Sequence, residues 1–302
     1  EHLNFKLFFI GCLIITLFIS IDIIYQFLNY KNIFGFLKTR YHSTGVFNQE
    51  AIAGGYIQRF GLFALFALSF IFYKQKKILF VSTTLILTIF ISAILFSGNR
   101  MPFILILFFC FLSIILIKSI RFPTIISLFF SSLIFLSTIN LNEGYKNNFE
   151  SFFSNSFALF KNVKNELQID IDTPKDYELY REGKTTFGSG HAYVWASAIE
   201  VWKQKPLIGG GIKNFRRKCI SIFNFRNSVC ESHPHNYYLD ILNDTGVIGL
   251  AIILLPIIYI LFKNFIHFRK YKDNLIFYSI FFNLLLEFLP IRSSGSFFAT
   301  QN

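Results

Sequence analysis

Charged side chains are scarce in this chain of 302 residues, where Asp, Glu, Lys and Arg together make up only 15%. Hydrophobic residues make up 53%, Phe alone occurs 42 times, and the mean hydropathy is +0.50. A soluble domain does not carry such an apolar load, so that class is excluded. The sequence also has no internal repeat and no low-complexity linker, which argues against the repeated architecture of many transporters.

Acidic residues are the scarcer charge, with 17 Asp and Glu against 29 Lys and Arg, and the formal net charge is +12. No basic stripe lies on a soluble face, so the excess does not indicate nucleic-acid binding. Instead, basic residues cluster in every second segment between apolar runs: Lys74, Lys76 and Lys77, then Lys118 and Arg121, then Lys263, Arg269, Lys270 and Lys272. The positive-inside rule assigns such segments to the cytoplasm.

Seven apolar runs approach the length of about 20 residues that a membrane helix needs. They cover residues 5–20, 51–73, 78–96, 103–117, 123–139, 237–262 and 275–290. The basic clusters place the loops at 74–77, 118–122 and 263–273 in the cytoplasm. The segments 22–50, 97–101 and 140–236, and the tail from Ile291, then face outward. We therefore predict an all-α fold, a polytopic integral membrane helical bundle with a large, partly helical periplasmic loop.

This topology divides the chain into three regions. Residues 1–139 hold five membrane helices and a periplasmic loop at 22–50, residues 140–236 form the large periplasmic loop, and residues 237–302 hold two membrane helices and an outer tail. Within the large loop, apolar residues recur at helical spacing and predict an amphipathic helix over 191–204 that lies along the membrane surface. The chain begins with Glu1 and shows no signal peptide, so we expect it to be truncated at one or both ends.

The chain has only four cysteines. Cys12 and Cys110 lie inside apolar runs and are expected to be inert packing residues. Cys219 and Cys230 both lie in the large outer loop, where an oxidising periplasm favours a disulfide. Two free thiols are the alternative, because spacing alone does not establish the geometry that a disulfide requires.

Titratable chemistry runs directly into an apolar helix at His233-Pro234-His235-Asn236. Nine residues separate Asn236 from the segment Gly246-Val247-Ile248-Gly249-Leu250. A His-Asn pair followed at this spacing by Gly-x-x-Gly-Leu resembles the signature of the O-antigen ligase and O-antigen polymerase family. Three other stretches are similar to that family: the first outer loop from Asp22 to Phe47, the turn Ser97-Gly98-Asn99-Arg100, and Pro206 to Phe215.

The resemblance covers roughly residues 22–298 and implies a helical glycosyltransferase of the C type. It implies a large periplasmic loop, arginines on the diphosphate of an undecaprenyl-diphosphate-linked glycan donor, and a catalytic histidine. Those roles fall on His235 as the catalytic residue and on Arg100, Arg216 and Arg40 at the diphosphate, with Arg59 as a further candidate. His233, Asn236 and Lys213 are candidate supporting residues.

A histidine suits the role of general base, because its ordinary pKa lies near 6.5 and an acceptor hydroxyl must lose its proton as it attacks the sugar. Asn236 would orient His235 or hold the acceptor. Pro234 restricts His233 to an extended shape, which predicts that the two imidazoles lie on different sides. Three alternatives stay open: the His-x-His pair binds a metal, although no full ligand set surrounds it; His235 caps the following helix; or His233 is the base.

Arginine binds a diphosphate better than lysine does, because its planar fork meets two phosphate oxygens at once. Each candidate also has a plainer interpretation. Arg40 is a solvated loop charge, Arg59 is wet if its helix starts later, and Arg100 snorkels to the interface. Otherwise Arg59 faces a cavity or a partner, since a charge inside a span is costly.

A glycine turn, Gly209-Gly210-Gly211, precedes Lys213 and Arg216. Backbone N–H groups at such a turn can hold phosphate oxygens. The alternative is a plain connector between two helices.

We interpret the chain as an enzyme of the bacterial inner membrane with its active site facing the periplasm. It would transfer a glycan from the lipid-linked donor to a glycan or lipid A-core acceptor, with inversion and without a metal or cofactor. The rival functions are a transporter or flippase of lipid-linked glycans and a protein O-oligosaccharyltransferase. We expect contact with membrane lipid, and we expect no nucleic-acid partner.

Overall fold

The computed structural model describes residues 2–39, 41–48, 50–72, 74–139, 143, 145–147, 149–150, 190–223, 230–266, 275–290, 292–293 and 295–298. They fall into two compact units. Unit 1 comprises Glu1–Phe149 and Asn264–Glu287, and unit 2 comprises Glu150–Lys263 and Phe288–Asn302. In the described residues all named secondary-structure elements are helices. A single isolated β-bridge there joins Lys31 and Leu37. The predicted all-α class is confirmed.

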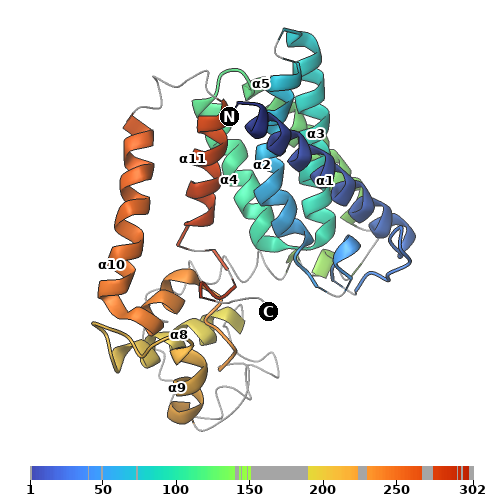
Figure 1. Cartoon of the computed structure of the whole chain (residues 1–302). Coiled ribbons are helices and arrows are strands. Elements are labelled where there is room, and N and C mark those ends of the chain that lie inside the picture. Colours follow the sequence, from blue (N-terminus) through green and yellow to red (C-terminus); the bar gives the residue numbers. More distant parts are fainter. Residues whose placement is uncertain are drawn as a thin grey trace. The chain divides into compact units, whose positions relative to one another are not determined.

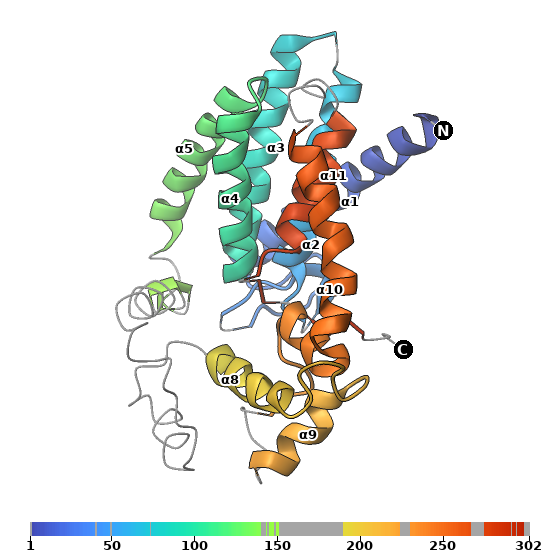
Figure 2. The same cartoon turned by 90° about the vertical axis from the view of Figure 1, so that its left-hand side faces the viewer.

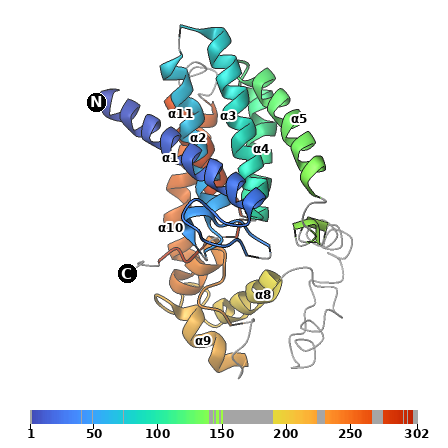
Figure 3. The ribbon, with the colours of Figure 1, turned by 90° about the vertical axis from the view of Figure 1, so that its right-hand side faces the viewer.

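Unit 1 is a helical bundle built around one central helix. Its elements are α1 (His2–Asn29), the short η1 (Gly45–Phe47), α2 (Ala53–Ile71), α3 (Lys76–Ser97), α4 (Arg100–Leu116), α5 (Arg121–Thr138) and α11 (Leu275–Glu287). The central helix is α2, which contacts α1, α3, α4 and α11 (Figure 1). Helix α1 runs obliquely across α2 and α3 (Figure 3). Helices α3, α4 and α5 pack side by side (Figure 2).

These helices approach closely at small side chains and at hydroxyl side chains that bond to the backbone of their own helix. A Cβ at Gly61 of α2 would lie 3.1 Å from Phe90 and 3.6 Å from Thr16, so the glycine lets α2 meet both α3 and α1. The hydroxyls of Thr16 and Ser20 donate to carbonyls four residues earlier, at 2.5 Å and 2.7 Å. Their polar groups are therefore satisfied without water inside the span.

Unit 2 contains α8 (Gly190–Lys203), α9 (Asn214–Phe223) and α10 (Tyr237–Ile266). Its small core joins α8 to α9 through Val194, Ala198, Val201, Phe215 and Cys219. Helix α10 bends at Gly246, where φ is 67° and ψ is −169°. A Cβ at this glycine would lie 2.2 Å from the Leu207 carbonyl oxygen, so a side chain is excluded there. The bend thus accommodates the loop that precedes α9.

Among the described residues, five helices are long and apolar enough to cross a membrane: α2, α3, α5 and α10 over their whole length, and α1 from Phe5 onward. Helices α4 and α11 are apolar but shorter. Each of the seven predicted spans coincides with one of these helices, and the chain is a multi-pass membrane protein. One boundary differs, because the first predicted run ends at residue 20 whereas α1 continues to Asn29. The helix continues because Asp22 and Gln26 are buried and bonded to the loop that follows.

Candidate functional site

The polar residues of unit 2 gather at the start of α10. Asn236 is buried, and its Oδ1 accepts hydrogen bonds from the backbone N–H groups of Tyr238 and Leu239 at 3.0 Å and 3.2 Å. This is the geometry of a helix N-cap, which satisfies donors that the first turn leaves unpaired. The capping role considered for His235 therefore belongs to Asn236.

His235 lies one residue before this cap, in the left-handed region with φ of 54°. Its Nε2 contacts the Glu231 carboxylate, and its side chain is 23% exposed. The His233 ring lies beside it, with centroids 4.2 Å apart. The prediction that the two imidazoles lie on different sides is wrong, because the chain turns at the positive φ of His235 and the two rings lie side by side.

The segment after α11 packs against the same turn of α10. Asn236 Nδ2 donates to the Pro290 carbonyl at 2.7 Å, and the Tyr238 hydroxyl donates to the Phe288 carbonyl at 2.5 Å. The buried Asp240 accepts bonds from Ser296 Oγ at 2.8 Å and from the Phe297 N–H at 2.7 Å. The segment after α11 therefore fixes the start of α10, where the His motif lies.

Two residues of this region were not singled out by the sequence as site residues. Glu231 contacts the ring of the predicted base. Arg292 has a side chain that is only 6% exposed, and its carbonyl accepts a weak bond from Asn236 Nδ2 at 3.4 Å. The proximity of Glu231 in sequence was a usable signal, since residues four apart often meet. Arg292 lies far along the chain, and no sequence pattern links it to the motif.

The start of α9 is fixed by a carboxylate from α10. Asp244 accepts hydrogen bonds from the N–H groups of Lys213 and Asn214 at 2.9 Å and 3.0 Å. The negative charge also complements the positive end of the α9 dipole. Gly210 and Gly211 donate their N–H groups to the carbonyls of α10 at positions 243 and 244, both at 2.9 Å. The glycine turn is therefore a connector, and its backbone N–H groups are already hydrogen-bonded to carbonyl groups of the protein.

The side chains at this helix start remain outside. Lys213, Arg216, Arg217 and Lys218 are all exposed. Arg217 reaches back to the carbonyls of Gly210 and Ile212, both at 3.3 Å. Arg216 makes no hydrogen bond or ion pair with the residues that the structure describes. These four cations, which begin directly before α9 and end at its fifth residue, are called the basic patch below.

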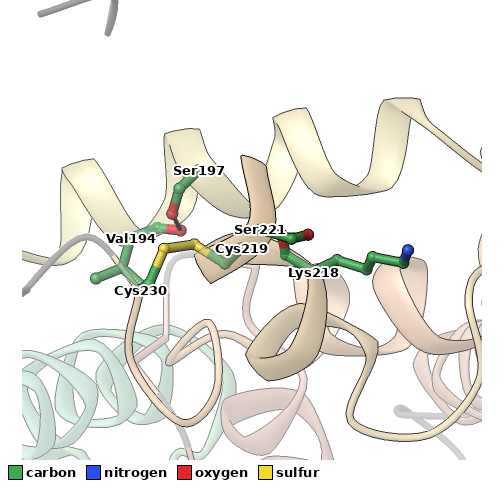
Figure 4. The surroundings of a disulfide bond; sticks show 6 residues. All are labelled: Val194, Ser197, Lys218, Cys219, Ser221 and Cys230. Carbon is green, nitrogen blue, oxygen red and sulfur yellow. Dashed lines mark hydrogen bonds between the residues drawn. A yellow bond between two sulfur atoms is a disulfide. The ribbon is translucent and has the colours of Figure 1, made fainter. Parts of the chain in front are cut away.

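Cys219 and Cys230 are joined by a disulfide, with Cα atoms 5.6 Å apart. Figure 4 shows the bond beside Val194 of α8, with Lys218 directed away from it. Cys219 is fully buried in the core of the unit, while Cys230 directly precedes Glu231. The covalent link thus ties the segment with Glu231, which contacts His235, to the hydrophobic core of unit 2.

In unit 1, Arg100 is the first residue of α4 and follows a tightly held turn. Asn99 accepts a bond from the Gly54 N–H at 2.9 Å and donates to the Ala51 carbonyl at 2.7 Å. His42 Nδ1 lies 3.1 Å from the Ser97 carbonyl oxygen. Two segments that the sequence places on the outer face, 22–50 and 97–101, therefore meet at one end of the unit.

His42 is a second histidine beside a candidate arginine. Since a carbonyl oxygen only accepts hydrogen bonds, Nδ1 of His42 carries the proton and Nε2 is the basic nitrogen of the neutral ring. Burial lowers the pKa of His42 below its ordinary value, and the charge of Arg100 lowers it further, while the bond to Ser97 acts in the opposite direction. The ring is therefore neutral near pH 7.

The remaining candidate arginines differ in what the structure shows. Arg59 lies inside α2, which begins at Ala53, so the interpretation in which the helix starts after Arg59 is wrong. Its guanidinium meets Glu287 of α11 through two bonds, at 3.0 Å and 3.1 Å. Arg40 lies outside the described residues.

Comparison with known proteins adds one positive finding. A family model described as O-antigen ligase matches residues 85–254, more than half of the chain. The match includes the Arg100 turn, the basic start of α9 and the complete His motif. Neither the curated proteins nor the solved structures contain a match. The chain belongs to the O-antigen ligase family.

Proposed function

We propose that the protein transfers a glycan from an undecaprenyl-diphosphate carrier to an acceptor hydroxyl at the periplasmic face of the bacterial inner membrane. The acceptor would be the lipid A-core, as in a ligase, or a growing glycan, as in a polymerase. The observation that carries this proposal is the contact between His235 and Glu231 directly before α10, an apolar helix long enough to cross a membrane. A histidine oriented by a carboxylate is a common arrangement for a general base.

The reaction is a displacement at the anomeric carbon. The acceptor oxygen attacks this carbon while its proton passes to His235. If Nε2–H of His235 donates to Glu231, Nδ1 is the ring nitrogen that accepts this proton, and Glu231 stabilises the resulting imidazolium. The bond between the anomeric carbon and the phosphate oxygen breaks, and polyprenyl diphosphate leaves with the electron pair. Attack from the face opposite the diphosphate inverts the anomeric centre.

Arginines would supply the positive charge for the leaving diphosphate. Arg216 stands in the exposed basic patch of unit 2, with Lys213 one turn earlier. Arg100 and Arg40 are assigned to the diphosphate through the family resemblance. Guanidinium groups stabilise negative charge that develops on the phosphate oxygens, so the proposed reaction is independent of a metal ion.

A reconstituted assay with a polyprenyl-diphosphate oligosaccharide tests this function. We expect His235→Ala to lower the transfer rate by about 10²–10⁴-fold, the usual range for a positioned proton acceptor. Arg100→Ala and Arg216→Ala should each cost about 10²–10³-fold, as the loss of one charge-stabilising donor does. Lys205→Ala removes an exposed cation of the same unit and serves as the matched control, with unchanged transfer.

The size of the products separates the acceptors. A ladder indicates a polymerase, a single addition to lipid A-core indicates a ligase, and a glycosylated protein indicates a protein transferase. Full transfer by His235→Ala at a normal membrane level would contradict the proposed base. Loss of transfer on adding a chelator would contradict the metal-independent mechanism. Movement of the donor lipid across the bilayer without its cleavage would indicate a transporter.

A further inference from the structure

The chain forms a small hairpin directly after α1, at residues 30–38. An antiparallel bridge pairs Lys31 with Leu37, and backbone bonds run from Asn32 N–H to the Phe36 carbonyl at 3.0 Å and from Lys38 N–H to the Tyr30 carbonyl at 3.0 Å. The Asn32 side chain lies inside the turn and accepts bonds from two further N–H groups, at 3.0 Å and 2.8 Å. The hairpin is therefore an ordered element with most of its inner polar groups paired.

Side chains of α1 hold this hairpin in place. Asp22 accepts a bond from the Ile33 N–H at 3.0 Å, and Gln26 Nε2 donates to the Phe36 carbonyl at 3.0 Å. Lys38 closes the base of the hairpin. Its ammonium lies 4.0 Å above the Tyr30 ring and donates to the Phe27 carbonyl at 3.3 Å, and burial lowers its pKa. The hairpin is fixed to the end of a membrane helix.

The tip of the hairpin is apolar and uncovered. Ile33, Phe34 and Leu37 are 50%, 60% and 65% exposed, and Phe36 is 37% exposed. In water such a patch would be unfavourable by roughly 25 cal/mol for each Å² of apolar surface. A rigid loop that presents four large apolar side chains indicates an apolar surrounding.

The tip continues a surface of α1 that faces lipid. Exposed apolar residues recur along α1 at steps of three and four, at Ile14, Phe18, Ile21, Tyr25 and Leu28. This stripe lies on a helix long and apolar enough to span the membrane, so its environment is the acyl chains. Tyr30 and the tip follow at the end of the stripe, and the exposed Lys31 stands between them.

We propose that the 30–38 hairpin inserts into the interface of the bilayer and seats this end of unit 1 on the membrane. The tip would lie at the boundary between headgroups and acyl chains, where amphipathic elements bury their apolar face. Tyr30, which follows the end of α1, stands at headgroup depth, as aromatic side chains do at membrane interfaces. Lys31 reaches the lipid phosphates.

Insertion of the hairpin into the interface would also affect the position of the Arg100 turn. The hairpin is bonded through Asn32 Nδ2 to the Gly45 carbonyl at 2.9 Å, and the same loop contacts the turn through His42. Within unit 1 the hairpin would therefore hold the Arg100 turn at a fixed depth near the lipid phosphates. The inference concerns lipid contact and does not depend on the transfer reaction.

Spin labelling of the full chain tests the proposal directly. The four native cysteines are either buried or joined in the disulfide, so a single added thiol can be labelled selectively. A nitroxide at Phe34→Cys is compared with one at Glu50→Cys, an exposed position in the same outer segment beyond the hairpin. Both proteins are reconstituted into vesicles of phosphatidylethanolamine and phosphatidylglycerol, and collisions with O₂ and with a water-soluble nickel chelate are measured.

We expect the label at position 34 to collide several-fold more with O₂ than with the nickel chelate, relative to the label at position 50. A label at Leu37→Cys should behave like that at position 34, and it replaces that variant if Phe34→Cys does not fold. Equal access of the nickel chelate to positions 34 and 50 would place the tip in water and overturn the proposal. Low collision with both reagents at positions 34 and 37 would mean that protein covers the tip, which also overturns it.

Discussion

Arg59 is a cation within an apolar helix, and its contact with Glu287 limits what it can do. Two parallel hydrogen bonds join the groups, and their side chains are 42% and 26% exposed. A guanidinium engaged in this way has fewer donors for a diphosphate. The residue is a candidate donor contact by the family resemblance, and its cost inside a span predicts a cavity or a partner. The structure shows that α11 supplies the partner, the carboxylate of Glu287.

Arg59→Met should lower the stability of unit 1 because it removes the two hydrogen bonds from the guanidinium to the Glu287 carboxylate. The expected loss is about 2 kcal/mol, between the values typical of exposed and of buried pairs. The double variant Arg59→Met with Glu287→Gln should recover most of this loss, which thermal unfolding in detergent would show. If the double variant is stable but has lost transfer, Arg59 contacts the donor as well. Full transfer by the double variant would remove Arg59 from the donor site.

The roles around His235 could be predicted only in part. The residue types and their spacing indicate a base beside a helix start, and this much follows from the sequence. The sequence does not show which residue caps the helix and how the two rings are placed, because both depend on the positive φ at His235. That conformation brings the two imidazoles together and leaves Asn236 to cap the helix.

At the scale of elements, the turn before α4 is clamped to the start of α2. Gly54 donates its N–H to Asn99, and a Cβ at Gly54 would lie 2.4 Å from Ser97 Oγ and 2.7 Å from Asn99 Oδ1. The adjacent Gly55 has only Pro102 nearby, at 3.8 Å. Two neighbouring glycines therefore have different roles.

Gly54→Ala should destabilise the protein by about 1–3 kcal/mol, because the added methyl forces the Ser97–Arg100 turn away from α2. Gly55→Ala is the matched control and should be neutral or stabilising by about 0.5–1 kcal/mol, since alanine is favoured over glycine in a helix. Thermal unfolding of both variants in the same detergent provides the comparison. Equal stability of the two would show that the turn adjusts without cost.

Most helices could be predicted from hydropathy, because a bilayer demands continuous apolar runs of a fixed length. The end of α1 could not, since its last turns carry polar residues whose partners are supplied by the loop after the helix. Asp22 and Gln26 interrupt the apolar pattern and suggest a loop, whereas their bonds to residues 33, 36 and 45 extend the helix.

At the scale of the whole molecule, the all-α membrane architecture follows from composition and from the seven apolar runs. The division into two units does not, because it depends on how the segment after α11 returns to α10. Phe288, Pro290 and Ser296 make contacts with α10 that no local pattern announces. Long-range pairing of this kind is set by three-dimensional packing and not by residue type.

The Cys219–Cys230 disulfide should stabilise the region of the His motif. It closes a loop with a sequence separation of 11 residues, for which the chain-entropy model gives about 3 kcal/mol. Reduction should increase hydrogen exchange over residues 230–239 and lower transfer, while exchange in α3 stays unchanged. The double variant Cys219→Ser with Cys230→Ser is the control, because its exchange should already be raised and should not respond to a reductant. Unaltered exchange after complete reduction would contradict the prediction.

The bonds between the glycine turn and α10 also set an order of events during synthesis. The N–H groups of residues 210, 211, 213 and 214 have partners that lie about 30 positions later in the chain, on Asn243 and Asp244. At roughly 5–20 residues per second, the ribosome completes those partners a few seconds after the turn itself. Until α10 has been made, these N–H groups lack the partners that Asn243 and Asp244 supply. The turn that carries the basic patch can therefore form its final hydrogen bonds only after α10, which is synthesised later, has folded against it.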